Sequence, residues 1–174
     1  MACKQGIRQN IEKSKEQYKK QKEHDPIREL WLSLVERVDK GPDGFAGLSV
    51  DEKLYFAVRL LDGEVYNGGF EQFFHNSSGE YFDEAARGLK LLEAESTLSV
   101  FLQATKILFG DSTPSKDRGA RWEQMKSLPD SPVDQVPDWY VELESLDQQY
   151  CKDPDNLDEK LDEFARSSLL PRDV

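Results

Sequence analysis

Two stretches of this sequence carry residue types that could do chemistry. The first ends at His75, one of two histidines in the chain, which follows Glu71 by four residues. On a helix this spacing puts an imidazole and a carboxylate on one face, a pairing suited to general-base catalysis. Such pairs are also common as plain helix-end contacts, because a cationic imidazole is favourable near a helix C-terminus. We therefore predict a structural role for His75 and a protein that is not an enzyme, with catalysis by His75 as an alternative.

The second stretch is a dense run of acids from Asp130 to Glu163. It holds twelve carboxylates against two bases, Lys152 and Lys160, so its net charge is −10. If the run folds as two amphipathic helices, its carboxylates lie away from the buried faces and point to solvent. The residues predicted to bind a partner are Asp138, Glu142, Glu144, Asp147, Asp158, Glu159, Asp162 and Glu163.

Charge density decides whether these carboxylates could stand in for a nucleic acid. At about 1.5 Å of helix rise per residue, the run carries about one net charge per 5 Å. Duplex DNA carries one charge per roughly 1.7 Å. Two acidic helices side by side would reach about one charge per 2.5 Å. Mimicry of a duplex therefore requires that the acidic segments pack together. The alternative is a solvated acidic face that confers solubility.

A glycine–phenylalanine motif lies just before His75. Gly68 and Gly69 are followed by Phe70, Phe73 and Phe74, whose spacing is that of one helix face. We predict a helix that begins at or just after the glycines. Without a Cβ, glycine allows a positive φ at a sharp helix-to-helix turn and the close approach of another segment. The alternative is a flexible loop followed by an ordinary core helix.

The same residues carry a resemblance to a known family. The positions that match are Asn67, Gly68, Gly69, Phe70, Gln72, Phe73, Phe74 and Asn76, then Gly79 and the run from Gly88 to Leu92. They resemble a family of bacterial proteins with the motif N-G-G-F-x-Q, whose best-known member is a dimeric, acidic DNA mimic. The resemblance covers roughly residues 27 to 150. It implies an all-helical fold and, for the characterised branch, a carboxylate surface that imitates DNA phosphates and occupies a DNA-binding protein.

Helical periodicity and capping signals place the other elements. Asp25 and Pro26 predict a helix start, and Ser49 with Glu52 predicts a capping box for a helix that ends at Asp62–Gly63. Later helices are expected at 80–93, 97–109, 121–126, 138–150 and from 157 onward, with Ser77 or Ser78 and Ser96 as caps. We predict an all-α, single-domain bundle of about seven to nine helices over residues 26–174, preceded by a basic arm or marginal helix over residues 1–25.

Composition excludes several functions. The formal net charge is −11, from 34 acids and 23 bases, which disfavours direct binding to nucleic acid or to anionic membranes. The first 40 residues carry a net charge of +3, which leaves −14 for the remainder. Cys3 and Cys151 are expected as reduced thiols, and no apolar run is long enough to span a membrane. We therefore expect a cytoplasmic protein.

These features predict a protein that works by binding. We expect an acidic binding protein, a homodimer, that acts as a DNA mimic and sequesters a basic DNA-binding transcription regulator. No cofactor and no metal is expected, because the histidines and cysteines share no ligand spacing. The alternative is a scaffold module that binds a peptide or small ligand in a pocket around Gly68, Gly69 and Phe70.

Overall fold

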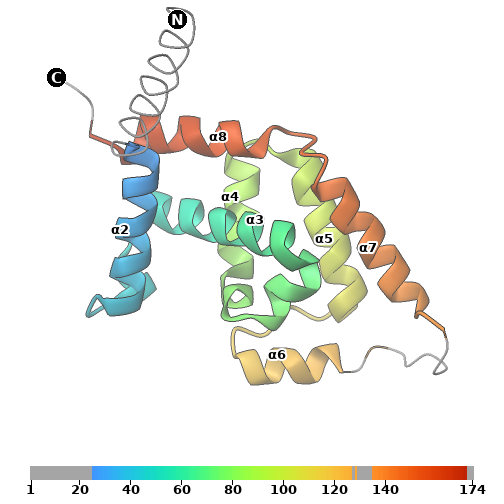
Figure 1. Ribbon diagram of the computed structural model, residues 1–174. Helices are drawn as coiled ribbons and strands as arrows, with labels where there is room; N and C mark the ends of the chain where they lie inside the picture. Colours follow the sequence, from blue (N-terminus) through green and yellow to red (C-terminus); the bar gives the residue numbers. More distant parts are fainter. Residues whose placement is uncertain (1–24, 127, 129–134, 172–174) are drawn as a thin grey trace, which may run out of the picture. The chain divides into compact units, whose positions relative to one another are not determined.

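Regular structure in the described part of the chain is entirely helical (Figure 1). The computed structural model describes residues 25–126, 128 and 135–171, so the predicted N-terminal arm lies outside it apart from Asp25. The described residues form seven α-helices and three short helices of 3₁₀ or π type, which confirms the predicted all-α class. The chain divides into two compact units, Met1–Gly47 and Leu48–Val174.

The first unit contains helix α2, Pro26–Lys40, and the 3₁₀ turn η1, Gly44–Gly47. The Asp25 carboxylate accepts hydrogen bonds from the amides of Ile27 and Arg28, at 3.1 and 3.3 Å. Proline follows at the first helical position, where its missing N–H costs nothing. The predicted helix start is therefore confirmed.

The second unit begins with the long helix α3, Val50–His75. The Ser49 hydroxyl accepts from the amide of Glu52, and the Glu52 carboxylate accepts from the amide of Ser49, so the predicted capping box is confirmed. The prediction that this helix ends at Asp62–Gly63 is wrong. Gly63 lies exposed inside α3, where a glycine costs only about 1 kcal/mol relative to alanine.

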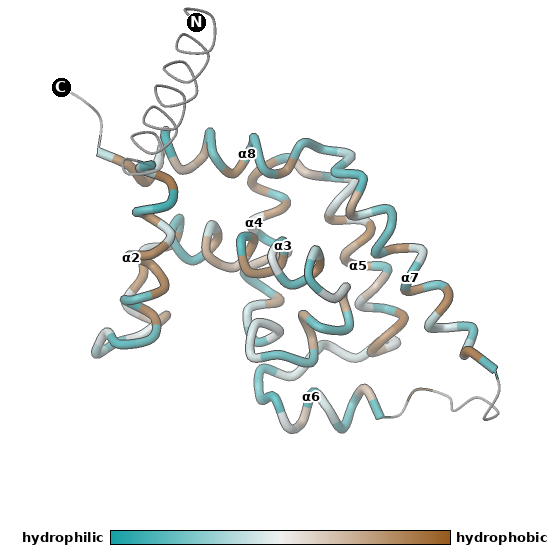
Figure 2. The backbone as a smooth tube through the Cα atoms, in the orientation of Figure 1, coloured by the Kyte–Doolittle hydropathy of each residue, from teal (hydrophilic) through white to brown (hydrophobic). Residues whose placement is uncertain are grey.

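The remaining elements of the second unit are η2 (Ser77–Tyr81), α4 (Phe82–Leu91), α5 (Glu95–Phe109), α6 (Arg118–Met125), α7 (Asp138–Tyr150), α8 (Leu157–Phe164) and the π-helical turn η3 (Ala165–Leu169). Figure 2 shows hydrophilic and hydrophobic residues mixed along these helices, as expected where each buries one face. Ser77, Ser78 and Ser96, also predicted as caps, do not cap α4 or α5. Ser78 instead donates to Glu64, and the Thr97 amide at the start of α5 donates to Asp155 at 2.7 Å.

An aromatic cluster forms the core of the second unit. Phe101 of α5 is fully buried and lies 5.6 to 6.0 Å, between ring centroids, from Phe70, Phe73 and Phe74 of α3. Tyr150 of α7 packs edge-on against Phe70 at 5.4 Å. The helix that the sequence marks as most apolar, α5, is therefore central to this unit, packed against α4 on one side and α7 on another.

Candidate functional site: the glycine kink and its acidic surroundings

Helix α3 is interrupted at the two glycines of the motif. Gly68 has φ −165° and ψ 25°, and Gly69 has φ 76° and ψ −179°. The second conformation is accessible essentially only to glycine, because any Cβ would be strained there. A new helical segment starts at Phe70 and ends at His75. The predicted helix-to-helix turn with a positive φ is thus confirmed.

The carboxylate of Asp147, on α7, lies in the space that the glycines leave. Its Oδ1 atom accepts a hydrogen bond of 2.8 Å from the backbone amide of Phe70, the first residue after the kink. A Cβ on Gly69 would collide with this same carboxylate. Burial raises the pKa of Asp147, the hydrogen bond from Phe70 lowers it, and the nearby charges of Glu144 and Glu71 raise it further. Three carboxylates from two helices therefore gather at the kink.

Glu64 holds the other side of the kink. Its carboxylate accepts hydrogen bonds from Gln72 at 2.6 Å, from the Asn76 side chain at 2.9 Å and from the Ser78 hydroxyl at 2.9 Å. Three hydrogen-bond donors that follow the kink in the chain therefore bind one carboxylate that precedes it. The motif residue Gln72 has a structural role, and fully buried Phe70 and Phe73 supply core contacts. Side chains of Gln72 and Asp147 lie next to Gly68 and Gly69, where the alternative prediction places a peptide or small ligand.

Helix α6 closes the C-terminal end of α3. Arg121 is fully buried, and its guanidinium donates to the backbone carbonyls of Phe74 and Asn76, both at 2.6 Å, and of Ser115 at 2.7 Å. The Phe74 carbonyl lies in the last turn of α3, where carbonyls lack intrahelical partners, and Arg121 supplies its donor. Sequence analysis did not single out Arg121, because a lone arginine in a polar segment gives no sign of burial.

His75 belongs to this helix-end arrangement. Its ring stacks on the ring of Trp122, with 4.6 Å between centroids, and its carbonyl accepts from the Trp122 indole at 2.7 Å and from Arg118 at 3.0 Å. Arg118 also lies over the Trp122 ring. The imidazole therefore packs against an aromatic ring of α6.

The eight carboxylates predicted to bind a partner fall into two groups. Asp147 is bound to the kink, and Asp158 and Asp162 form ion pairs with Arg59 of α3, each at 2.5 Å. Burial would lower the pKa of Arg59, but hydrogen bonds to Asp158 and Tyr55 raise it above its ordinary value. The other five carboxylates are exposed and have no hydrogen bond or ion pair within the described residues, namely Asp138, Glu142, Glu144, Glu159 and Glu163.

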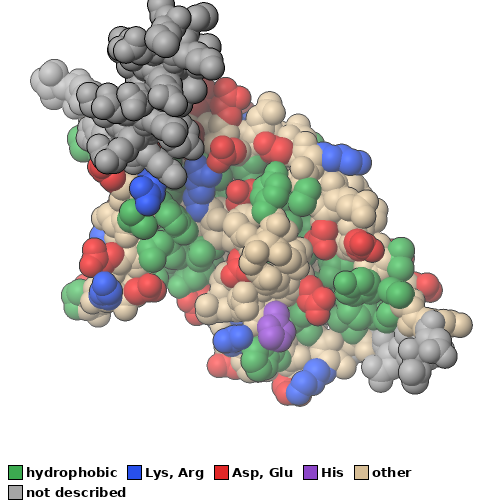
Figure 3. All heavy atoms as spheres, viewed as in Figure 1, with side chains coloured by type: hydrophobic (Ala, Val, Ile, Leu, Met, Phe, Trp, Pro, Cys, Tyr) green, Lys and Arg blue, Asp and Glu red, His purple; other side chains and the backbone are tan. Residues whose placement is uncertain are grey.

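The two acidic helices do not lie side by side. Helix α7 packs mainly on α5 and α3, whereas α8 packs mainly on η3 and α3, and the two meet end to end at an angle (Figure 1). The dense strip that two parallel acidic helices would form is therefore absent from the described residues. Instead, α3 contributes acids of its own, and Figure 3 shows acidic side chains spread over α3, α7 and α8 on one face, with hydrophobic side chains between them.

A second acidic cluster lies where α3 meets the C-terminal end of α7. The Tyr150 hydroxyl donates to Asp62 of α3 at 3.2 Å. Burial raises the pKa of Asp62, and the hydrogen bond from Tyr150 and the charge of Arg59 lower it. The charges of Asp158 and Asp153 raise it again. Sequence reasoning did not include Asp62 and Glu71 in the acidic surface, because they lie on α3, far from the acidic run in the chain.

The fold and this site define an all-helical protein built on a glycine-kinked helix, with carboxylates from α3 and α7 gathered around the kink. A family model described as DMP19-like protein matches residues 46–168, and the chain belongs to this family. No curated protein and no solved structure matches the chain. In the described part of the chain, no helix is long and apolar enough to cross a membrane, and no cluster of histidine, cysteine or acidic side chains is placed to hold a metal ion.

Proposed function

We propose that this protein is an acidic binding protein that acts as a DNA mimic and sequesters a basic DNA-binding transcription regulator. Membership of the DMP19-like family supports this function, since that family contains DNA mimics. Because α7 and α8 do not form one acidic strip, the charge density that mimicry requires would have to come from acids of α3 beside those of α7. The structural observation that carries the proposal is that Asp147 of α7, with Glu144 one turn before it, lies at the kink two residues from Glu71 of α3. We also propose that the protein works in the cytoplasm as a homodimer, in which two copies would form a longer acidic surface.

The electrostatics of the kink favour a cationic partner. Burial is the main cause of the raised pKa of Asp147, and the charges of Glu144 and Glu71 add to it because like charges repel one another. A lysine or arginine of a partner would relieve this repulsion. Exposed Glu144 and Glu142 on α7 can meet such a cation without first breaking an ion pair within the described residues. Binding driven in this way is fast and weakens as salt screens the charges.

Displacement of DNA from a regulator tests the function. The protein is titrated into complexes of the host's basic regulators with labelled operator DNA, and release of the DNA is followed by fluorescence anisotropy at low and high salt. We expect release at low salt that weakens strongly at high salt. No release from any of these complexes at low salt would count decisively against a DNA mimic.

A charge-matched pair of variants locates the surface. Glu142→Gln with Glu144→Gln removes two exposed carboxylates of α7, and Glu93→Gln with Asp111→Asn removes two exposed carboxylates elsewhere in the same unit. The first pair should weaken displacement about tenfold or more, as expected for the loss of two charge contacts. The second pair should change it little. Equal effects would mean that only net charge matters and that α7 is not the binding surface.

A further inference from the structure

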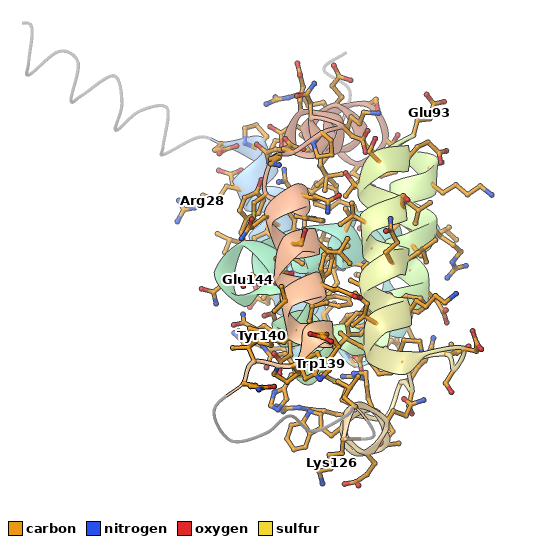
Figure 4. All side chains as sticks on the ribbon, turned by 90° about the vertical axis from the view of Figure 1, so that its right-hand side faces the viewer. Arg28, Glu93, Lys126, Trp139, Tyr140 and Glu144 are labelled. Atoms are coloured by element: carbon orange, nitrogen blue, oxygen red, sulfur yellow. The ribbon has the colours of Figure 1, made fainter. Side chains whose placement is uncertain are left out.

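The groove between α5 and α7 adjoins the exposed carboxylates of α7. It has a volume of about 500 Å³ and is lined by Gln103, Lys106 and Ile107 of α5 and by Glu142, Ser145 and Leu146 of α7. Figure 4 shows these two helices side by side, with the side chains of both helices meeting between them. The α7 wall is acidic, because Asp138 lies one helical turn before Glu142 on the same side of the helix.

The apolar part of the groove lining comes from Ile107 of α5 and Leu146 of α7. Ile107 is half-buried, and Leu146 at the base of the groove is almost fully buried. Negative charge beside an apolar groove is suited to a partner with both cationic and aliphatic side chains. The charge orients the partner, and the apolar contact contributes affinity.

We infer that this groove binds an amphipathic basic helix, whose aliphatic side chains enter between α5 and α7 while its lysines and arginines meet Asp138 and Glu142. The inference rests on the proposed function and adds the kind of segment that the partner offers. A helix laid on a groove between two helices presents side chains three and four residues apart to that groove. The occupant therefore needs leucine-like residues at this spacing, flanked by bases.

Lys106 allows the charge of the segment bound in the groove to be tested. Lys106 lines the α5 wall opposite Glu142 and is exposed. A basic helix in the groove would be repelled by this ammonium group, so Lys106→Ala should tighten its binding by about two- to fivefold at low salt. A partner held only at the kink would not respond to Lys106. Weaker binding after Lys106→Ala would overturn the assignment of a basic occupant.

Two synthetic helical peptides of equal net charge are the direct probes. One places leucines three and four residues apart between lysines and arginines, and the other replaces the leucines by serines. The amphipathic peptide should bind about tenfold more tightly, a difference that an apolar contact of modest area provides. Equal dissociation constants for the two peptides would overturn the groove assignment while leaving the charge-based function in place.

Filling the groove supplies the matched control. Ser145→Trp puts a large ring at an exposed position in the groove, and Ser168→Trp puts the same ring at an exposed position on η3. The first change should remove the preference for the amphipathic peptide, and the second should preserve it, with both variants unfolding at the wild-type temperature. Gln103→Trp, from the α5 wall, provides a second filling variant should the first lower stability.

The remaining outcomes are also decisive. If Ser145→Trp changes the sedimentation of the protein from dimer to monomer and leaves peptide binding intact, the groove is a contact between two copies and the inference is wrong. If neither peptide binds, the groove inference is likewise wrong, and the displacement assay with operator DNA still decides the proposed function separately. Loss of displacement with intact peptide preference would instead overturn the DNA-mimic function alone.

Discussion

Asp147 and the backbone amide of Phe70 are 2.8 Å apart, although the two residues are separated by 77 positions in the chain. This hydrogen bond fastens α7 to the start of the helical segment that follows the kink. It also places a carboxylate where a side chain at Gly69 would have to go. The glycine motif and the acidic helix are therefore one structural unit, so changes at the kink should affect the position of the proposed binding surface.

Gly69→Ala should destabilise the second unit strongly. The substitution introduces a Cβ at φ 76° and ψ −179°, which costs about 1–3 kcal/mol in backbone strain, and it also displaces Asp147. Gly63→Ala is the matched control, since Gly63 is helical, exposed and has open space around its Cβ position. That change should stabilise the protein by about 0.5–1 kcal/mol. Urea unfolding of both variants measures the contrast, and a similar effect at the two positions would contradict it.

Asp147→Asn should change how stability depends on pH. Because the pKa of Asp147 is raised in the folded protein, chiefly by burial, the folded state binds this proton more tightly than the unfolded state does. The contribution of Asp147 is therefore most favourable below its ordinary pKa of about 3.9, and it is lost as the pH rises through the folded value. The free energy of unfolding of wild type relative to Asp147→Asn should fall across this window. A relative stability that rises with pH would show that the charged carboxylate is favoured.

Structural features that depend on residues close together in the chain could be predicted from the sequence, whereas features that depend on distant residues could not. Asp25 with Pro26 and Ser49 with Glu52 act within one turn, so their residue types predict the two helix starts. The periodicity of the phenylalanines likewise predicts the helix after the kink. Gly63 and Gly69 are the same residue type, yet only Gly69 breaks the helix, because its role depends on Asp147 of a distant helix.

The division of the acidic residues could not be predicted for the same reason. Local spacing shows which carboxylates face away from the apolar stripe, and six of the eight are exposed as predicted. It does not show that Arg59, about one hundred positions earlier, neutralises Asp158 and Asp162. Nor does it show that α3 carries acids next to those of α7, since that needs the packing of the two helices.

Glu64→Gln should cost the second unit about 1–3 kcal/mol, the penalty for leaving polar partners unsatisfied. The Glu64 carboxylate accepts from the amides of Gln72 and Asn76 and from the Ser78 hydroxyl. A glutamine would turn an amide donor toward these donors and keep only one acceptor atom. Glu93→Gln, at an exposed position, should change the melting temperature little. Equal melting temperatures for the two variants would show that Glu64 is not the centre of this network.

Arg121→Met should be the most destabilising of these substitutions, at about 3 kcal/mol or more, because it removes a fully buried guanidinium that donates to three backbone carbonyls. The affected carbonyls are those of Phe74, Asn76 and Ser115. Arg118→Met serves as the control, since Arg118 is exposed and its main contacts are to the His75 carbonyl and the Trp122 ring. Its loss should cost about 1 kcal/mol or less. Thermal unfolding followed by far-UV circular dichroism measures both effects. A small effect at Arg121 would mean that water can replace its guanidinium.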